Sequence, residues 1–393
     1  MNNNIIKVGI IGSGFAAKFH FDALRRVISA KIEVVGAFSK NKINLNNFTE
    51  PRGIKAFESL DALIDYCDVL HLCTPPSTHE PMAVEILKAN KFVIIEKPFT
   101  GYFGNGSDSF SGKNFNREDG LKYALDSINR MLNAENNSLG KILYAENWIY
   151  SPAVQKEREV IEKTGAQILW IQGQQSHSGS HSPDYGKWYL SGGGSLMGKG
   201  CHPLAAAIYL KQVEGRTKNG APIRPLAVSA RTHNITGMAS YDNKGLLRDS
   251  YNDVEDYANI HLVFEDGTFA DIVASELLQG GVKNYLEVHA NNHRTICNIA
   301  PNNAMQIFNP VNEILKDVYV VEKTDTKEGW SSISPDEGWF NGYQHEMDSF
   351  YDSIVNNSEI QSDSKLAADV ISVVYHAYLS AALSGKEIEI SKQ

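Results

Sequence analysis

The sequence predicts an α/β protein with two parts, an N-terminal doubly wound parallel sheet and a C-terminal α+β part with a mainly antiparallel sheet. Three observations lead to this prediction. Short apolar strands alternate with helical patterns as far as residue 140, a glycine-rich turn joins the first strand to the first helix, and strand patterns joined by turn residues dominate from residue 141 onward. We therefore place one domain at residues 1–140 and a second at 141–393, with a C-terminal helix able to pack back on the first domain.

The length and composition support this division and exclude several classes of protein. With 393 residues, 42% of them hydrophobic, the chain is too long for one ordinary core and apolar enough to bury two. A formal net charge of −9, without a lysine- or arginine-rich block, argues against a nucleic-acid partner. We find no signal-peptide pattern and no stretch near the roughly 20 apolar residues of a membrane helix, so we expect a cytoplasmic protein without a membrane partner. The four cysteines show no C-x-x-C spacing and are expected to be reduced thiols.

The turn after the first strand, residues 5–11, is the most informative feature, and a helix is predicted over residues 16–27. Gly12 suits a tight turn, Gly14 lets backbone N–H groups approach a pyrophosphate, and Ala17 lets the helix pack closely on the strand. The positive end of the helix would then point at the phosphates. The turn therefore predicts a dinucleotide site, with contacts from Gly12, Ser13, Gly14, Phe15 and Ala16.

The rest of the N-terminal part repeats the alternation of strand and helix. Strands are predicted at residues 32–38, 69–73 and 92–95, and helices at 60–66, 79–88 and 118–135. In such a sheet the ligand lies beyond the carboxyl ends of the strands, so we expect cofactor contacts from the residues that follow the strands, namely Thr74, Pro75, Pro76, His79, Glu96 and Lys97. Residues 101–117 are polar and rich in glycine and serine, and are predicted to form a mobile surface loop.

Beyond residue 140 the patterns are mainly those of strands. We predict strands at 142–150, 168–175, 226–232, 257–264, 268–276, 285–290, 295–299 and 318–321. Turn signals such as Glu265-Asp266-Gly267 indicate antiparallel neighbours. Two long helices close the chain at 342–356 and 364–384, and Gly385 is a stop signal.

Three features together resemble the Gfo/Idh/MocA family, the group of glucose-fructose oxidoreductase and inositol dehydrogenase. They are the glycine turn, the tripeptide Glu96-Lys97-Pro98, and the run from Gly192-Gly193-Gly194 to His202, and their order and spacing match over nearly the whole chain. The resemblance implies a Rossmann domain followed by an open-faced antiparallel sheet, a nicotinamide cofactor, and usually a sugar or cyclitol substrate. It also implies a homodimer or homotetramer that forms through the open sheet.

The end of the second predicted strand bears on the choice of cofactor. An acidic residue there would bind the ribose 2′-hydroxyl of NAD, whereas small polar and basic residues accept the 2′-phosphate of NADP. Ser39 stands where the acid would be, and Lys40 follows it. Both cofactors stay open, with a slight preference for NADP; the alternative is that Lys40 is a solvated turn residue and NAD binds through other contacts.

Oxidation of a secondary alcohol requires a base for the hydroxyl proton, a positive group near the developing alkoxide and a hydride acceptor close to the carbon. Lys97 follows the fourth strand, and the resemblance places this lysine beside both cofactor and substrate. The resemblance also places a catalytic histidine after the glycine run, so His202 is predicted as the proton acceptor. The alternatives are a surface lysine and a hydrogen-bonded core histidine.

Around His202 the chain departs from the family pattern. Most dehydrogenases of the family carry an aspartate four residues before this histidine and often another acid three residues after it, where this chain has Gly198 and Ala205. The usual Asp–His pair is therefore missing, and Pro203 is expected to distort the helix locally. Lys199 lies one turn from His202, and our hypothesis is that it projects into the pocket beside Lys97 and favours an anionic sugar. The alternative is that Lys199 faces solvent.

Residues 172–188 combine hydroxyl, imidazole and aromatic groups, which suits a sugar. His177 and His181 are predicted to bind the substrate. With Asp184 they could also hold a metal, but we expect none, because the family's chemistry uses none and the segment has the pattern of a loop. Trp148 and Tyr150 are expected to line the same cleft, the alternative being that they belong to the core.

The leading prediction is an NAD(P)-dependent oxidoreductase that acts on a carbohydrate or cyclitol hydroxyl, with Lys97 and His202 at the reacting centre. A first alternative is an NAD-dependent glycoside hydrolase, which would oxidise the sugar transiently, eliminate the aglycone, add water and reduce the ketone again. The missing aspartate favours such a changed mechanism. A second alternative is a non-catalytic dinucleotide-binding sensor, against which the presence of both Lys97 and His202 argues.

Overall fold

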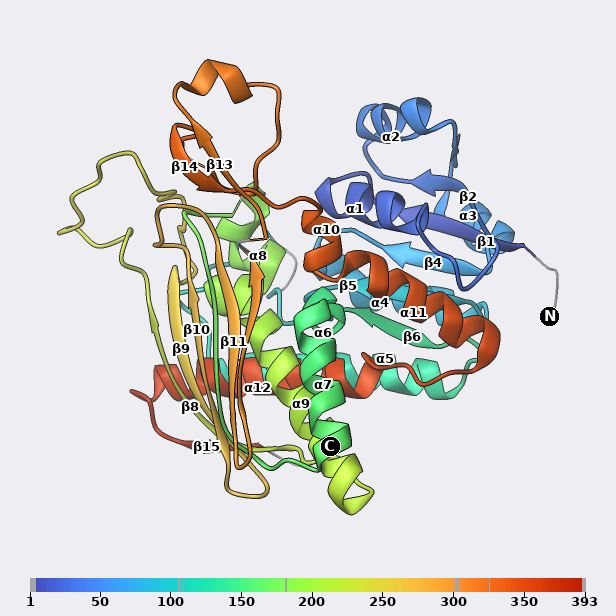
Figure 1. Cartoon of the computed structure of the whole chain (residues 1–393). Coiled ribbons are helices and arrows are strands. Elements are labelled where there is room, and N and C mark those ends of the chain that lie inside the picture. The colour runs from blue at the N-terminus through green and yellow to red at the C-terminus, as the bar shows by residue number, and fades with distance from the viewer. Residues whose placement is uncertain are drawn as a thin grey trace.

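The computed structural model describes residues 5–104, 107, 109–180, 182–300, 304–324 and 326–390, and its N-terminal part is a six-stranded parallel sheet (Figure 1). The strand order is β3-β2-β1-β4-β5-β6, so the chain starts in the middle and winds outward in both directions. The strands are β1 (Ile6–Ile11), β2 (Ile32–Phe38), β3 (Lys55–Ala56), β4 (Val69–Leu72), β5 (Phe92–Glu96) and β6 (Ile142–Ala145). The helices beside them are α1 (Phe15–Leu24), α2 (Lys42–Thr49), α3 (Leu60–Tyr66), α4 (His79–Lys88) and α5 (Arg117–Asn136), with short 3₁₀ turns η1 (Glu50–Arg52) and η2 (Pro76–Thr78).

The central strands form because their side chains are apolar on both faces, as buried parallel strands require. Val8 and Ile10 of β1 and Ile94 of β5 are fully buried. The two strands that the sequence analysis did not assign to this sheet lie at its edges. β3 has only two residues, too few for a recognisable pattern, and β6 carries the sheet past residue 140.

The prediction of a strand over residues 142–150 is correct as far as Ala145 and wrong beyond it. Glu146 follows β6, and its carboxylate accepts a 3.4 Å hydrogen bond from the Trp148 amide at the start of the short helix α6 (Asn147–Tyr150). Helix α7 (Pro152–Thr164) begins directly afterwards, with Pro152 at its first position, where a missing N–H costs nothing. Trp148 and Tyr150 therefore lie on a helix rather than a strand.

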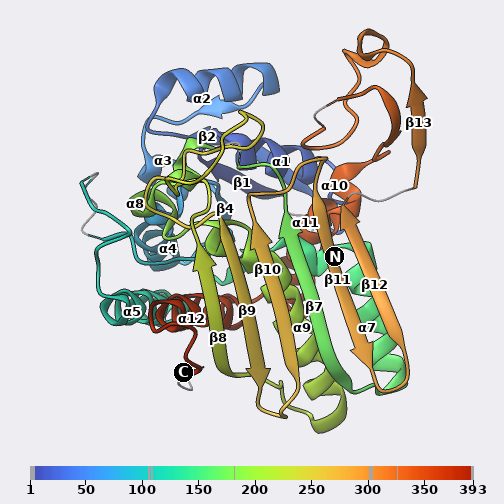
Figure 2. The same ribbon diagram turned by 90° about the vertical axis from the view of Figure 1, so that its left-hand side faces the viewer.

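The C-terminal sheet has seven strands in the order β12-β11-β7-β10-β9-β8-β15. Only the β7–β10 pair is parallel among these described strands. Figure 2 shows one broad face of the sheet open to the viewer. Along β9 every second residue is buried, because the inner face of the sheet packs on helices. The strands are β7 (Ile168–Ser176), β8 (Pro225–His233), β9 (Tyr257–Phe264), β10 (Phe269–Ser275), β11 (Lys283–Ala290), β12 (Arg294–Ala300) and β15 (Ile388–Glu389).

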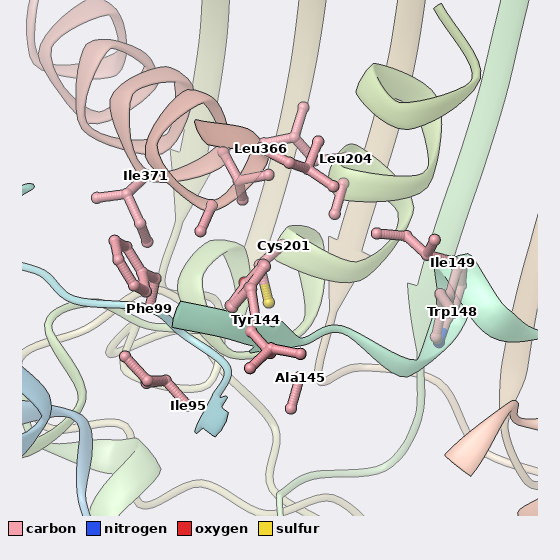
Figure 3. Packing of buried hydrophobic residues seen from close by; sticks show 14 of the residues in the cluster. Ile95, Phe99, Tyr144, Ala145, Trp148, Ile149, Cys201, Leu204, Leu366 and Ile371 are labelled. Carbon is pink, nitrogen blue, oxygen red and sulfur yellow. The ribbon is translucent and has the colours of Figure 1, made fainter. Parts of the chain in front are cut away.

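Two helices join the parts into one continuous core. Helix α9 (Cys201–Asn219) is buried from Cys201 to Gly215, since it lies among β7, α7 and α12 (Ser364–Ala382). Helix α12 packs on α5 as well as on β8, so it packs back on the N-terminal part. Figure 3 shows the junction, where apolar side chains of both parts meet: Ile95, Phe99, Tyr144, Cys201, Leu204, Leu366 and Ile371. Helix α12 ends at Ala382, and Ser384 (φ +58°) and Gly385 (φ +80°) follow in left-handed conformations. The Gly385 amide donates a 2.8 Å hydrogen bond to the Ser380 carbonyl oxygen, so the predicted stop signal takes part in closing the helix end.

A small lobe follows β12 and differs from the prediction. It pairs β13 (Gln306–Asn309) with β14 (Gly329–Ser332), whereas residues 318–321 form no strand. Their apolar pattern has another cause, because Val320 is buried in a small cluster with Leu315 and Ile333. The lobe also contains η5 (Asn312–Leu315), and α10 (Glu337–Phe340) and α11 (Tyr343–Asn356) follow it.

A mobile loop was predicted over residues 101–117. Helix α5 begins at Arg117, and as far as residue 116 the positions that the structure describes contain no helix or strand. Their aromatic side chains pack on the main body: the Phe115 ring lies 5.0 Å from the Trp188 ring, and the Tyr102 ring lies 5.1 Å from Phe115. Across the described ranges, none of the helices has both the length and the apolar character needed to cross a membrane.

Candidate active site

A cavity of about 810 Å³ lies between the carboxyl ends of the parallel strands and the C-terminal part. This is where the topology of a doubly wound sheet places a ligand. Of the residues predicted as contacts, the following line it: Gly12, Ser13, Gly14, Phe15, Ala16, Ser39, Lys40, Thr74, Pro75, Pro76, Glu96, Lys97, His177, Lys199 and His202. His79, Trp148 and Tyr150 do not, and His181 lies outside the described residues.

The glycine turn has the geometry that a dinucleotide requires. Gly12 has φ +108°, and a Cβ there would lie 2.3 Å from the Cys73 carbonyl oxygen, so no other residue fits without rearrangement. A Cβ on Gly14 would meet nothing within 4 Å, so the approach to the N-terminus of α1 is open. The residues present therefore fit a dinucleotide whose pyrophosphate lies at this helix end.

The residues that follow β2 form the adjoining end of the cavity. Phe38, Ser39, Lys40, Asn41 and Asn44 line it, and none of these five carries a carboxylate. The Asn41 side chain accepts a 3.0 Å hydrogen bond from the Asn44 amide and so caps α2.

His79 was predicted to contact the cofactor, and the structure corrects this. Its ring is fully buried, with Nδ1 2.9 Å from the Pro98 carbonyl oxygen and Nε2 3.0 Å from the Thr74 carbonyl oxygen. Burial lowers the pKa of His79. The ring therefore links the segments after β4 and β5 without reaching the cavity.

Lys97 reaches across the cavity to the C-terminal part. Its Nζ donates a 2.9 Å hydrogen bond to the Gly198 carbonyl oxygen and lies 5.3 Å from the centre of the Tyr185 ring. Burial alone would lower the pKa of Lys97, but nearby acidic groups, among them the Glu96 and Glu146 carboxylates, raise it above its usual range. Lys97 is therefore a fixed cation in the cavity wall.

A buried chain of hydrogen-bonding groups supports Glu96 from behind. His20 Nε2 lies 2.8 Å from Glu96 Oε1, His20 Nδ1 lies 2.8 Å from His71 Nδ1, and His71 Nε2 lies 2.9 Å from the Tyr351 hydroxyl. Burial and the neighbouring His20 lower the pKa of His71, so this ring is neutral. With Glu96 ionised, one set of protons satisfies all three contacts: Tyr351 donates to His71, His71 to His20, and His20 to Glu96.

His202 has a carboxylate partner, although the aspartate four residues earlier is absent. Glu146 Oε1 lies 2.5 Å from His202 Nδ1, and the two residues are 56 positions apart in the chain. The Trp148 ring stacks on the imidazole, with the ring centres 5.8 Å apart and the planes 17° from parallel. The usual Asp–His pair is absent, as the sequence predicts, but a carboxylate–histidine pair exists, because the carboxylate comes from the segment after β6.

The turn before His202 is widened. Residues Leu196–Gly200 form a π-helical turn (η4), and Pro203, which has no N–H to donate to the preceding turn, lies just beyond it. Glu255 anchors the start of this turn by accepting hydrogen bonds from the Gly194 and Leu196 amides, at 3.0 and 2.9 Å. The expected distortion near Pro203 thus occurs, and it leaves the Gly198 carbonyl facing Lys97.

Lys199 lines the cavity, as hypothesised, but it is not an uncompensated cation. It forms an ion pair with Glu276, and its Nζ lies 3.1 Å from Ser180 Oγ. Glu276 in turn accepts a 2.7 Å hydrogen bond from the Tyr251 hydroxyl. Burial lowers the pKa of Lys199, while Glu276 opposes this shift.

Three further substrate candidates have different outcomes. Trp148 and Tyr150 are 1% exposed and belong to the core: Trp148 stacks on His202, and the Tyr150 hydroxyl lies 2.8 Å from Ser362 Oγ. His177 does line the cavity, and its Nδ1 accepts a 3.1 Å hydrogen bond from the Gly179 amide.

Glu146, Cys201 and His202 form one group of potential metal ligands among the described residues, with ligand atoms within 4.8 Å of one another. Burial, opposed by the Lys97 ammonium and reinforced by the Glu146 carboxylate, raises the pKa of the Cys201 thiol to about 12, so the thiol is neutral. The Lys97 ammonium lies nearby and would repel a metal cation, and Glu146 lies 2.5 Å from His202. Both observations fit a hydrogen-bonded acid–base pair better than a metal site.

The sequence analysis missed Glu146, Tyr185 and Glu276. Glu146 follows a strand of the parallel sheet, so the rule that placed Glu96 in the site would have found it had residues 142–145 been assigned to that sheet. Tyr185 lies within the segment 172–188, but its sequence context predicted no role for it. Glu276 ends a predicted strand and carried no signal.

Glu346 on α11 is fully buried, and neither of its carboxylate oxygens has a hydrogen-bond partner among the residues that the structure describes. Burial and the nearby Glu96 and Glu146 carboxylates raise the pKa of Glu346 well above the usual value for a glutamate. Because the folded state holds this proton more tightly than the unfolded state, the stability contribution is complete below about pH 4.5 and is lost as the pH rises above it, by up to about 1.4 kcal/mol per pH unit.

Glu346→Gln, which mimics the neutral carboxyl group, is therefore expected to raise the melting temperature at pH 8 and to change it less at pH 5. Thermal unfolding at both pH values measures the change in melting temperature. Glu387→Gln, a substitution at an exposed residue, is the control. An equal shift at both pH values would show that Glu346 is not a buried neutral acid.

Comparison with known proteins agrees with this geometry. Residues 6–108 match the family model described as "Oxidoreductase family, NAD-binding Rossmann fold", and residues 154–294 match the "GFO/IDH/MocA C-terminal domain". Together these two models span most of the chain.

Curated relatives and solved structures are similar as well. Glucose-6-phosphate 3-dehydrogenase of Bacillus subtilis is 26% identical over 69% of this chain and 67% of its own length. UDP-N-acetylglucosamine 3-dehydrogenase of Acidithiobacillus ferrooxidans is 32% identical, but over only 24% of this chain and 29% of its own. The structure of GenD2 from gentamicin A biosynthesis in complex with NAD superposes with a TM-score of 0.77 at 18% identity, over 99% of this chain and 97% of that one, and so supports the fold.

Proposed function

This chain belongs to the Gfo/Idh/MocA family of oxidoreductases, whose N-terminal domain is an NAD-binding Rossmann fold, and from this premise we propose that it transfers a hydride between a sugar or cyclitol hydroxyl and a nicotinamide cofactor. One observation carries the proposal. The cavity that starts at the glycine turn also contains Lys97 and His202, with Lys97 bound to the carbonyl of the turn that leads to His202.

In this proposal His202 is the base. With Nδ1–H donated to the Glu146 carboxylate, Nε2 keeps its lone pair and takes the proton of the sugar hydroxyl. Glu146 then stabilises the imidazolium. The Lys97 ammonium stabilises the negative charge that develops on the sugar oxygen. When bound, the nicotinamide supplies the acceptor for the hydride.

We further propose that the substrate region extends to His177, Ser180 and Lys199, which line the part of the cavity beyond His202. Lys199 has three N–H donors, and Glu276 and Ser180 occupy two. No hydrogen bond of the third is seen within the described part of the chain, and we assign it to a hydroxyl group or an anionic group of the substrate. The name of the Bacillus subtilis relative states a sugar phosphate, which supports including anionic sugars among the candidates.

The region after β2 supports a preference for NADP, because Ser39 and Lys40 line the cavity and no carboxylate stands with them to bind a 2′-hydroxyl. Ser39→Asp is expected to shift the ratio of the two dissociation constants at least about tenfold toward NAD, because it adds an acceptor for the hydroxyl and repels the 2′-phosphate. Fluorescence titration with NADH and NADPH measures the shift. A wild-type enzyme with a clear preference for NAD would contradict the assignment.

We propose that the protein forms a homodimer or homotetramer through the outer face of the C-terminal sheet (Figure 2). Trp170 stacks on His289 on this face, with ring centres 4.4 Å apart, and Leu169 of β7, Leu226 of β8 and Ile296 of β12 are exposed on strands of the same sheet. Sedimentation velocity at micromolar concentration would show a species larger than the 43.5 kDa chain. A monomer at that concentration would contradict the proposal.

The experiment that tests the function is incubation with NAD or NADP and a panel of neutral sugars, anionic sugars, cyclitols and glycosides, in which reduced nicotinamide and glycoside cleavage are followed together. Net reduction of the cofactor supports a dehydrogenase. Cleavage without net reduction would instead identify a redox-assisted glycoside hydrolase. Tight cofactor binding without either reaction would favour a non-catalytic sensor.

A further inference from the structure

Tyr185 lies in the cavity beside the two groups to which the proposed chemistry is assigned. It belongs to the 3₁₀ turn η3 (Pro183–Gly186) and lines the cavity together with Lys97, Gly198 and His202. The turn connects β7 to the short helix α8 (Trp188–Ser191) and has no counterpart among the elements predicted from the sequence.

The backbone on both sides of Tyr185 is fixed by hydrogen bonds from a distant segment. Arg248 Nη1 donates to the carbonyl oxygens of Ser180 and Ser182, at 2.6 and 2.7 Å. The Asn252 amide donates a 3.2 Å hydrogen bond to the Gly186 carbonyl oxygen. A side chain held in this way is preorganised, as a group that acts in catalysis must be.

The Tyr185 ring occupies space that Gly198 leaves free. A Cβ built on Gly198 would lie 3.1 Å from Tyr185 Cδ1 and 3.3 Å from Cε1, closer than ordinary contacts. The same glycine offers its carbonyl oxygen to Lys97. Tyr185, Lys97 and Gly198 therefore form one corner of the cavity, one turn before His202.

The phenol of Tyr185 is in the protonated, donating state. Burial raises its pKa, and the Lys97 ammonium acts in the opposite direction through its charge and by hydrogen bonding. The ring centre is 5.3 Å from Lys97 Nζ. A neutral phenol beside a fixed cation presents two donors to one place in the cavity.

We propose that Tyr185 is a catalytic residue whose hydroxyl donates a hydrogen bond to the reacting sugar oxygen, as the second donor beside Lys97. This inference rests on the proposed function. During oxidation the hydroxyl proton passes to His202 and the hydride leaves the carbon for the nicotinamide. The oxygen becomes a carbonyl oxygen, and Tyr185 keeps its proton while stabilising the charge on that oxygen.

The test compares Tyr185→Phe with Tyr189→Phe, a matched loss of a hydroxyl group on α8, at a residue that does not line the cavity. Each variant is assayed with the first sugar of the panel that the wild type oxidises, used both unlabelled and fully deuterated on carbon. We expect Tyr185→Phe to lower kcat about 10- to 100-fold and to increase the deuterium isotope effect on kcat, because the loss of a donor slows the chemical step. The NADPH dissociation constant and the melting temperature should stay close to those of the wild type, and Tyr189→Phe should match the wild type throughout.

A wild-type kcat in Tyr185→Phe, or a loss confined to KM, would overturn the proposal. A fall in kcat without an increased isotope effect would also overturn it, because a merely structural role lowers the active fraction and leaves the chemical step unchanged. If the wild type oxidises no sugar of the panel, the proposed function fails first. If the wild type is active and Tyr185→Phe is equally active, only the role of Tyr185 fails.

Discussion

Lys97→Met is expected to lower kcat by on the order of 10³-fold while leaving cofactor binding nearly unchanged. The side chains are similar in length, but methionine has no charge and no donor for the Gly198 carbonyl oxygen or the reacting sugar oxygen. A preorganised donor to a developing oxyanion contributes about 10²–10³-fold, and the loss of a full charge from a buried site adds to this. Stopped-flow or steady-state reduction of the cofactor measures the effect, and titration with NADPH measures binding.

Lys187→Met is the matched control, because Lys187 is exposed and does not line the cavity. It should retain wild-type kcat and wild-type binding. Turnover by Lys97→Met within about tenfold of the wild type would remove Lys97 from the chemistry. Loss of cofactor binding in that variant would instead assign Lys97 to the nucleotide site.

The N-terminal part could be predicted closely because its signals are local. A central parallel strand is an uninterrupted apolar run, and residues 32–38, 60–66 and 79–88 have the predicted elements at the predicted bounds. The glycine turn is similarly local, because its residues are consecutive in the sequence, and Gly12 has the positive φ that such a tight turn requires. The same rule then located Lys97, because the carboxyl ends of adjacent parallel strands meet at one edge.

The partners of the site residues could not be predicted, because they are distant in sequence. His202 is 56 positions from Glu146, and Lys199 in η4 pairs with Glu276, the residue directly after β10. From the sequence, a partner of His202 could be sought only at a spacing of four residues along the same helix. In this chain Gly198 occupies that position. Which carboxylate replaces it depends on how α9 packs against the segment after β6, a tertiary contact without a local pattern.

Trp148 illustrates the same limit for aromatic residues. An aromatic side chain near a site suits a sugar face and a protein core equally well in sequence. Here the chain turns into α6 directly after Glu146, which places Trp148 behind the His202 ring rather than in front of it. Its contribution to the site is therefore to hold the imidazole against Glu146.

Glu146→Gln should lower kcat by on the order of 10²–10⁴-fold, the range attributed to general acid–base catalysis. Glutamine keeps the size of the side chain and can still accept from Nδ1–H, but it cannot stabilise the imidazolium with a negative charge. If its NH₂ group faces Nδ1 instead, the proton moves to Nε2, and the atom that should take the sugar proton is blocked. In either orientation the variant should fold and bind NADPH.

Glu157→Gln provides the matched control, because Glu157 is buried and lies 2.9 Å from His293 in a second glutamate–histidine pair outside the cavity. Glu157→Gln should alter stability without changing kcat per folded molecule. The combined variant Glu146→Gln with His202→Asn should be hardly slower than His202→Asn alone, because Glu146 acts through the imidazole. If the fall in kcat of the double variant equals the product of the falls in the two single variants, Glu146 and His202 act independently. The base would then have to be sought among the other titratable groups of the cavity.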